Sequence, residues 1–415
     1  MRPTRSITGN TPLRRFTAAT LGLLTSVAIA TAPSAGAVPG PQPAPNWSGL
    51  DVTGGVALPG TPGVPVGEVP LSPELGLSGA GAQQRFVYST VDQHGEEAAS
   101  TAAVFLPAGE APEDGWPVLA WAHGTTGLGD NCTPSAQVRS DRDAAFLNHW
   151  LEQGYAVVAS DYAGMGTPGL MSYLNGKITS ANVVDSVAAA RGLDSVGAKL
   201  SGTWAVIGQS QGGGVALHVA HKASARSAEV GLDYRGAVAT GAPAYVEELV
   251  LAGSPSFPPV ALPDTLSAYV AYILAGFREA HPEVDLSSAL TEEGRRVADL
   301  AETACLGEMS EELSGEVLSG LFNRPLREIP GLAAALRDYM ATPTDGYDKP
   351  VFLGHGLTDI DVPSPIGIAL NSEMWVNQFA GSNEQVEVHW YPTDHSGAMV
   401  ASVPDSTPFL QRIMG

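Results

Sequence analysis

The pentapeptide GQSQG at residues 208–212 places a serine between two glycines, in the pattern G-x-S-x-G. In this pattern a sharp turn from a strand into a helix exposes the serine hydroxyl group, which can then act as a nucleophile. A short apolar run, Trp204–Ile207, precedes the motif, and a helix pattern, Gly212–Ala225, follows it. These flanking patterns favour a nucleophilic Ser210 over a serine that only forms a turn.

A nucleophilic serine needs a base that accepts its proton, and the base needs an acid that orients it. Of the nine histidines, His395 is the candidate base, because it follows the expected last strand, Val386–Tyr391. On a loop at the C-terminal end of that strand, its imidazole ring could reach the serine. His389 lies within the strand and is expected to pack or to pair there. His218 and His221 have a spacing that metal ligands can have, but no further Cys, His or carboxylate cluster supports a metal site.

Asp359 is the candidate acid, and Asp361 is the alternative. Both lie in the segment GLTDIDVP at 356–363, which follows the apolar run Val351–Leu353. We favour Asp359 because it is the nearer of the two to the end of the expected strand. The chain order of nucleophile, acid and base is then that of the α/β-hydrolases, and it differs from the orders in chymotrypsin and subtilisin.

The tetrahedral intermediate of acyl transfer carries a negative oxygen, which backbone N–H groups must stabilise. The segment HGTTG at 123–127 follows the apolar run Val118–Ala122, which is where such an oxyanion loop belongs. We expect the N–H groups of Gln211 and Thr125 to be the donors, with Thr126 as the alternative to Thr125. A threonine hydroxyl could add a further hydrogen bond. The histidine that opens the segment is expected to shape the loop and not to act as a base.

These residues can meet only if several strand ends lie side by side. Apolar runs with little alternation favour strands that are buried on both faces, and helix patterns lie between the runs. The runs are Val118–Ala122, Ala156–Ser160, Trp204–Ile207, Gly236–Ala239, Val351–Leu353 and Val386–Tyr391, after a strand pair at Arg85–Asp92 and Ala98–Leu106. The helix patterns are Ala136–Gln153, Ala181–Leu193 and Gly212–Ala225. This alternation predicts a doubly wound, mostly parallel α/β sheet with helices on both faces.

The segment 245–348 interrupts the alternation, because it contains no convincing strand. It contains helix patterns at Leu266–Glu279, Leu290–Thr303, Glu311–Leu321 and Pro330–Tyr339. We expect these helices to form a cap inserted between two strands, over a core made of residues 81–244 and 349–415. Residues 38–80 are rich in Pro and Gly, so we expect them to form an extended N-terminal arm.

The first 37 residues have the pattern of a signal peptide. Four arginines precede an apolar stretch, and the small residues at 35–37 suit a signal peptidase. We therefore expect export and a mature chain that starts at Val38. No later run is long and apolar enough to predict a transmembrane segment. The net charge of −22 over 415 residues argues against nucleic acid and anionic membrane surfaces as partners.

Cys132 and Cys305 are the only cysteines of the chain. In an oxidising compartment such a pair most simply forms one disulfide. Two free buried thiols are the alternative. A catalytic cysteine is disfavoured, because neither residue lies in a recognisable nucleophile motif.

Several motifs together resemble the secretory lipase family, which includes actinobacterial secreted lipases and, more distantly, the yeast lipase A type. The motifs are AHGTTG at 122–127, CTPS at 132–135, SDYAGMG at 160–166 and QSQGG at 209–213. The resemblance extends from about residue 85 to the C-terminus and includes the cap. It implies the α/β-hydrolase fold and a triacylglycerol or carboxyl-ester hydrolase. It also implies Ser210, Asp359 and His395 as the triad and a disulfide at Cys132.

We therefore expect a secreted, extracellular serine hydrolase of carboxylic esters. The expected reaction is cleavage of triacylglycerols and of medium- or long-chain acyl esters through an acyl-enzyme, without a metal or an organic cofactor. The expected partner is an ester or lipid substrate, which a lipid–water interface could present. A short-chain esterase, an acyltransferase and a polyesterase are alternatives with the same triad. A non-catalytic binding protein is disfavoured, because the triad and the oxyanion loop are intact.

Overall fold

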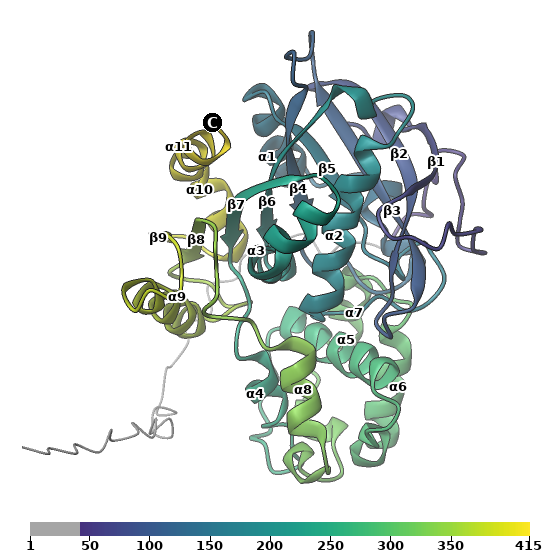
Figure 1. Cartoon of the computed structure of the whole chain (residues 1–415). Coiled ribbons are helices and arrows are strands. Elements are labelled where there is room, and N and C mark those ends of the chain that lie inside the picture. Colours follow the sequence, from purple (N-terminus) through teal and green to yellow (C-terminus); the bar gives the residue numbers. More distant parts are fainter. Residues whose placement is uncertain (1–41) are drawn as a thin grey trace, which may run out of the picture. The chain divides into compact units, whose positions relative to one another are not determined.

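The structure, a computed structural model, describes residues 42–415, so the expected signal peptide lies outside the described residues. A nine-stranded sheet has the order β1-β2-β3-β5-β4-β6-β7-β8-β9 (Figure 1). The strands are β1 (Pro65–Pro70), β2 (Ala80–Val91), β3 (Glu97–Pro107), β4 (Trp116–Ala122), β5 (Ala156–Ser160), β6 (Leu200–Gln209), β7 (Asp233–Thr240), β8 (Val351–Gly356) and β9 (Val386–Tyr391). From β5 through β4 to β9 all neighbours pair in parallel, whereas β1, β2, β3 and β5 pair antiparallel. The predicted mostly parallel α/β sheet is confirmed.

Helices cover both faces of the sheet, because successive side chains of a strand point to opposite faces. Leu119 and Trp121 of β4 pack in one core with side chains from α1 (Asp141–Glu152) and α11 (Val403–Met414). Val118 and Ala120, the alternate residues, pack in the other core with α2 (Gly176–Arg191), α3 (Gln211–Glu229) and α9 (Ser364–Phe379). Strands that are buried on both faces explain why their sequences are apolar without clear alternation.

Five helices lie between β7 and β8, and Figure 1 shows them gathered at one end of the sheet. They are α4 (Val246–Val250), α5 (Asp264–Ala280), α6 (Glu292–Ala301), α7 (Leu306–Glu312) and α8 (Leu332–Met340). The helix expected at Glu311–Leu321 is wrong, since α7 ends at Glu312. Gly315, whose φ of 78° is left-handed, lies between α7 and a short turn at Leu318–Leu321. We call the segment from α4 to α8 the cap.

The segment expected to be an N-terminal arm contributes to the sheet and to its core. β1 pairs antiparallel with β2 and forms one edge of the sheet. An edge strand tolerates Pro65 and Pro70, because proline lacks a backbone N–H and the outer side of an edge strand has no neighbouring strand that would accept one. Leu71, Leu75 and Leu77 are buried in the same core as α1. The prediction of an extended arm over 38–80 is therefore corrected for this part of the segment.

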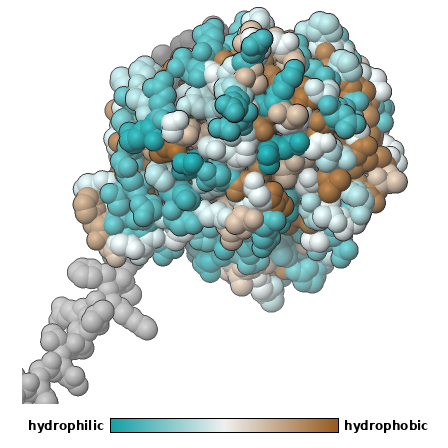
Figure 2. All heavy atoms as spheres, turned by 45° about the horizontal axis from the view of Figure 1, so that its top comes forward, coloured by the Kyte–Doolittle hydropathy of each residue, from teal (hydrophilic) through white to brown (hydrophobic). Residues whose placement is uncertain are grey.

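Figure 2 shows one face of the described residues, on which hydrophilic side chains predominate and hydrophobic ones form smaller groups. Within residues 42–415, the helices are too short or too polar for any of them to cross a bilayer.

Candidate active site

The carboxyl ends of β4, β6, β8 and β9 lead into the residues that the sequence singles out. Ala122 at the end of β4 pairs with Gly208 of β6, and Gly356 at the end of β8 pairs with Tyr391 of β9. Parallel strands end at the same edge of the sheet, and the loops at this edge form the binding crevice of open α/β sheets. The ends of β4 and β9 are about 270 positions apart in the sequence, and the topology brings the loops that follow them to the same edge.

Ser210 forms a sharp turn between β6 and α3. Its backbone angles are φ 60° and ψ −126°, a conformation that side-chain-bearing residues rarely adopt. A Cβ atom on Gly208 would clash with the carbonyl oxygen of Gly212, and one on Gly212 would clash with that of Ala122. The backbone N–H of Ser210 donates to Thr240 of β7 at 2.9 Å. The two glycines thus permit the close approach that this turn requires.

Asp359 and His395 form a buried pair. The distance between Nδ1 of His395 and Oδ2 of Asp359 is 2.6 Å, and Oδ1 of Asp359 accepts the N–H of Val362 at 2.8 Å. An ionised carboxylate only accepts hydrogen bonds, so Nδ1 carries the ring proton and Nε2 is left as an acceptor. Within residues 42–415, Nε2 of His395 is buried and has no hydrogen-bond partner. A base that is oriented in this way can accept a proton from a hydroxyl group.

His395 lies on a helix and not on the loop that we expected. It is the first residue of α10 (His395–Ala401), and the side chain of Asp394 accepts the N–H of Gly397 at 2.7 Å. This N-cap starts a helix directly after the strand and fixes the backbone of the histidine. The backbone oxygen of His395 also accepts a long hydrogen bond, 3.5 Å, from Nε2 of Gln209.

Asp361, the alternative acid, lies against the cap and not against His395. Its Oδ1 accepts the hydroxyl group of Tyr269 of α5 at 3.2 Å. Burial and the nearby Asp361 carboxylate raise the pKa of Tyr269, so the hydroxyl keeps its proton and donates it. The structure therefore pairs Asp359 with His395 and gives Asp361 a contact between the cap and the acid loop.

The expected oxyanion loop lies against the serine turn. A Cβ atom on Gly124 would lie 3.5 Å from Cβ of Ser210. Among residues 42–415, neither the N–H of Thr125 nor that of Gln211 donates to a backbone or side-chain acceptor. The Thr125 hydroxyl is hydrogen-bonded to the Tyr173 hydroxyl at 2.8 Å. Both expected donors thus remain available beside the serine.

Thr126, the alternative donor, faces the cap. Its carbonyl oxygen accepts the N–H of Leu306, the first residue of α7, at 2.8 Å. Its hydroxyl group is buried and has no hydrogen-bond partner among the described residues. A disulfide joins Cys132 to Cys305, with their Cα atoms 5.4 Å apart, and so ties the chain after the oxyanion loop to the start of α7. The predicted disulfide is confirmed.

His123 has the surroundings of a residue that shapes the loop. Its Nδ1 lies 2.7 Å from the carbonyl oxygen of Gly124, and its ring stacks on that of Tyr162, with ring centres 4.3 Å apart. Burial lowers the pKa of His123, so the ring stays neutral. Asp161, next to this tyrosine, is buried and accepts hydrogen bonds from the Thr101 hydroxyl and the Ser135 N–H. These contacts hold the loops and leave both residues without an exposed reactive atom.

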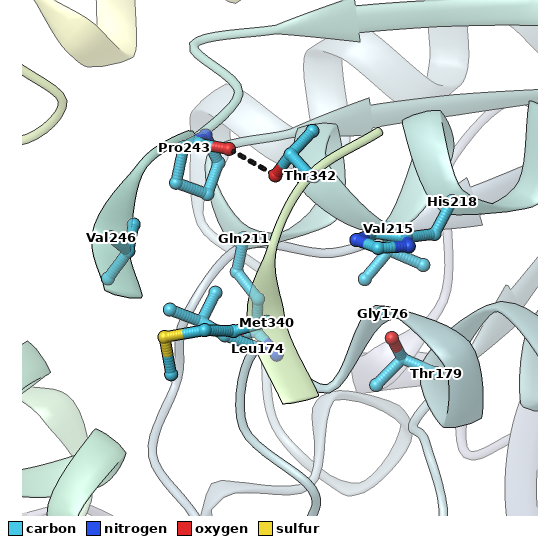
Figure 3. A pocket seen from close by; sticks show the side chains of 11 residues that line it. Leu174, Gly176, Thr179, Gln211, Val215, His218, Pro243, Val246, Met340 and Thr342 are labelled. Carbon is cyan, nitrogen blue, oxygen red and sulfur yellow. Dashed lines mark hydrogen bonds between the residues drawn. The ribbon is translucent and has the colours of Figure 1, made fainter. Parts of the chain in front are cut away.

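A small apolar cavity lies beside the serine turn, under the connections to the cap (Figure 3). Its volume is about 20 Å³, which is room for about one water molecule. Gln211, Val215 and His218 of α3 line one side, and Val246 of α4 and Met340 of α8 also line it. The cavity therefore combines the residue that follows Ser210 with two helices of the cap.

His389 is a residue of β9, as the sequence indicated. His389 stacks on Phe352, with ring centres 4.6 Å apart, and its Nδ1 lies 3.6 Å from Oδ2 of Asp405. It therefore both packs and pairs, as expected. Residues 42–415 contain no group of three or more His, Cys, Asp or Glu side chains that could hold a metal ion.

Sequence reasoning missed three residues that contact the site. Tyr173 binds the Thr125 hydroxyl, Tyr269 binds Asp361, and Nε2 of His355 lies 3.5 Å from Oδ2 of Asp359. The tyrosines come from segments without a recognisable motif. His355 directly precedes the Gly356 turn, and its position at the end of an apolar run was the available signal.

Comparisons with known proteins agree with the fold described above. The model of the family "Secretory lipase" matches residues 133–332. Among solved structures, Candida antarctica lipase A in its closed state has 19% identity and a TM-score of 0.68, with 85% of this chain and 82% of that chain covered. A rice cell wall degrading esterase, LipA from Xanthomonas oryzae, has 19% identity and a TM-score of 0.65, with 85% and 98% covered.

A putative hydrolase from Legionella pneumophila has 16% identity and a TM-score of 0.62, with 84% of this chain and 97% of that chain covered. At these identities the structural likenesses show the fold. None of the curated proteins compared matches the chain. The family match supports a hydrolase of the lipase or esterase type. The resemblance that the motifs indicated is confirmed: the chain is similar to the secretory lipases over residues 133–332 and has the α/β-hydrolase fold.

Proposed function

We propose that this chain is a secreted serine hydrolase that cleaves triacylglycerols and medium- or long-chain acyl esters. The observation that carries the proposal is the 2.6 Å pairing of His395 with Asp359, at the same sheet edge as the Ser210 turn. A buried imidazole with an oriented, unpartnered nitrogen is the base that a serine nucleophile requires.

In the first half of the proposed reaction, the Ser210 hydroxyl attacks the ester carbonyl and His395 Nε2 accepts its proton. Asp359 holds the ring and stabilises the imidazolium that forms, without itself taking the proton. The N–H groups of Gln211 and Thr125 stabilise the negative oxygen of the tetrahedral intermediate. The imidazolium then protonates the leaving alcohol, and an acyl-enzyme on Ser210 remains.

In the second half, His395 removes a proton from water, and the resulting hydroxide attacks the acyl-enzyme. The same oxyanion donors stabilise the second intermediate, and the imidazolium returns its proton to Ser210. The products are a carboxylic acid and the free enzyme. No metal or organic cofactor takes part in these steps.

The apolar side chains that the cap places beside the serine turn favour acyl chains longer than acetate. The cavity borders Gln211 and is walled by Val246 and Met340 of the cap. Each methylene group that moves from water into such surroundings contributes about 0.8 kcal/mol. The pocket has room for about one water molecule, so an acyl chain enters only when cap side chains such as Met340 move aside; each further carbon buried in this way should then tighten binding.

Export is part of the proposal. The signal-peptide pattern at 1–37 and the Cys132–Cys305 disulfide both suit an oxidising, extracellular environment. The acidic net charge favours uncharged lipids over anionic membranes as the place of action.

An ester series tests the proposal. Hydrolysis of p-nitrophenyl esters with two to eighteen carbons, and release of fatty acid from emulsified triolein, should be measured for the parent and for Ser210→Ala. We expect kcat/KM to rise from acetate to at least eight carbons, triolein to be cleaved, and the variant to be inactive.

A maximum at acetate without triolein cleavage would indicate a short-chain esterase. Transfer of the acyl group to an added alcohol in preference to water would indicate an acyltransferase. Release of monomers from a polyester, with triolein left intact, would indicate a polyesterase.

A further inference from the structure

His355 lies at the end of β8, and its imidazole ring is buried beside the Asp359–His395 pair. The residue is 1% exposed. Its Nε2 lies 3.1 Å from the carbonyl oxygen of Val362 and 3.5 Å from Oδ2 of Asp359. A carbonyl oxygen only accepts hydrogen bonds, so the ring proton is on Nε2 and this N–H faces both oxygens. The reaction described above assigns no role to this histidine.

Val362 links His355 to the carboxylate a second time. Its N–H donates to Oδ1 of Asp359 at 2.8 Å, while its carbonyl oxygen accepts from His355. Oδ2 of Asp359 faces Nδ1 of His395 at 2.6 Å and Nε2 of His355 at 3.5 Å. Oδ1 of Asp359 thus accepts the N–H of Val362, whereas Oδ2 faces two imidazole rings.

The position of the His355 ring is fixed by its packing. A Cβ atom on Gly367 of α9 would lie within 2.5 Å of Nδ1 of His355, so only glycine leaves room for the ring. Trp390 of β9 packs on the ring, with ring centres 5.9 Å apart. A ring held in this way points its N–H in one direction. Fixed direction is what a group needs if it is to orient another side chain.

The charges around His355 keep it neutral while His395 takes up a proton. Burial lowers the pKa of His355, the Asp359 carboxylate opposes this effect, and a positive charge on His395 adds to it. The contacts from β9 and α9, Trp390 and Gly367, are uncharged. Asp359 and His395 are thus the titratable groups that act on His355.

We propose that His355 is a positioning residue for the acid of the triad, an inference that rests on the proposed function. Its Nε2–H holds the turn through Val362, directs Oδ2 of Asp359 towards His395, and takes up part of the carboxylate charge. An N–H that faces a carboxylate stabilises its negative charge, so the 3.5 Å approach of this N–H to Oδ2 should weaken the hold of Asp359 on the proton of His395.

Three substitutions test this role. In His355→Gln the side-chain amide N–H can reach the position of Nε2. In His355→Asn the side chain is too short to place its amide N–H there. His355→Leu is apolar and has no donor. kcat, KM and the pH profile of kcat/KM should be measured with p-nitrophenyl butyrate for each variant, and thermal unfolding should confirm that each is folded.

We expect the Asn and Leu variants to lose about 3- to 10-fold in kcat, the range expected when a neutral hydrogen bond, here to the Val362 carbonyl oxygen, is lost. KM should stay within about twofold, because His355 does not touch the substrate. The acid limb of kcat/KM should move to higher pH, since the full carboxylate charge then binds the proton on His395 more strongly. The Gln variant should keep the kcat and the acid limb of the parent.

Two results would overturn the inference. One is a kcat and an acid limb in the Asn variant that equal those of the parent. The polar Asn side chain is expected to allow folding even if the Leu variant does not fold. The other is an equal loss in the Gln and Asn variants without any shift of the acid limb, which is the result for a residue that only packs.

Ser210→Ala separates this inference from the proposed function. If that variant keeps its activity, the proposed function fails; if it is inactive while the His355 variants behave as the parent does, the role of His355 alone fails.

Discussion

Oδ2 of Asp359 lies 2.6 Å from Nδ1 of His395, although the two residues are 36 positions apart and follow different strands. The pairing in β8 and β9 explains this proximity, because Gly356 and Tyr391 are partners at the ends of these strands. Each residue then begins its own short turn or helix at the same edge of the sheet. The sheet register thus brings the two side chains together.

This relationship distinguishes the two candidate acids. Asp359→Asn should lower kcat by about 10⁴, because the amide orients the imidazole in the wrong tautomer. Asp361→Asn should keep most of the activity, because its carbonyl oxygen can still accept the hydroxyl of Tyr269. Steady-state hydrolysis of a p-nitrophenyl ester measures both variants. Loss of activity in the Asp361 variant, with activity kept in the Asp359 variant, would contradict the assignment of Asp359 as the acid.

The disulfide should stabilise the cap on the core. Cys132 and Cys305 are separated by 173 positions, so the bridge closes a long loop. Chain-entropy reasoning gives a stabilisation of at most roughly 5 kcal/mol for such a loop. In urea, the double variant Cys132→Ala/Cys305→Ala should therefore unfold at a lower concentration than the parent. Alkylation of the native parent, followed by mass spectrometry, should find no free thiol; two alkylated cysteines would contradict the bridge.

The position of the candidate residues at the strand ends could be predicted from the sequence because it depends on short motifs next to apolar runs. The G-x-S-x-G turn, the segment after β4 and the order of the candidate acid and base each need only local patterns. β5 and β9 have the bounds that their apolar runs predict, although β5 is buried throughout and β9, at the sheet edge, is mostly half-buried. Local patterns of this kind identify the strand ends that the site requires.

The contacts that support the site could not be predicted, because they join distant side chains. Tyr269 reaches Asp361 across 92 positions, and Tyr173 reaches Thr125 across 48. The short helix that begins at His395 depends on the N-cap at Asp394, and the sequence around it has too few residues for a helical period. β1 was missed because its prolines are typical of loops. They fit here because β1 is an edge strand, with β2 as its neighbour on one side and no strand on the other.

His218 predicts a specific loss of stability in acid. Its pKa is lowered to about 3 by burial, with smaller effects from His221, Lys177 and Lys222. The unfolded chain binds a proton near the ordinary histidine value of about 6.5, whereas the folded chain does so only near the lowered value. The unfolded state therefore binds more protons between these values, so the contribution is complete above about pH 6.5 and is lost as the pH falls.

His218→Gln should remove this dependence. At about pH 4.5 the linkage amounts to at most about 3 kcal/mol, so the Tm of the parent should fall more steeply from pH 7.5 to 4.5 than that of the variant. Thermal unfolding of both proteins at several pH values measures the difference. The same slope in both proteins would show that His218 titrates alike in the folded and unfolded chains.

The central claim is that Ser210 forms an acyl-enzyme with the help of His395. The most direct measurement is reaction with a p-nitrophenyl alkylphosphonate, which transfers its phosphonyl group to an activated serine, followed by peptide mass spectrometry. The account predicts a single phosphonyl group on the peptide that contains Ser210, complete loss of ester hydrolysis, and no labelling in His395→Ala. Labelling of a different residue, or an unlabelled Ser210 in a preparation that still hydrolyses esters, would contradict it.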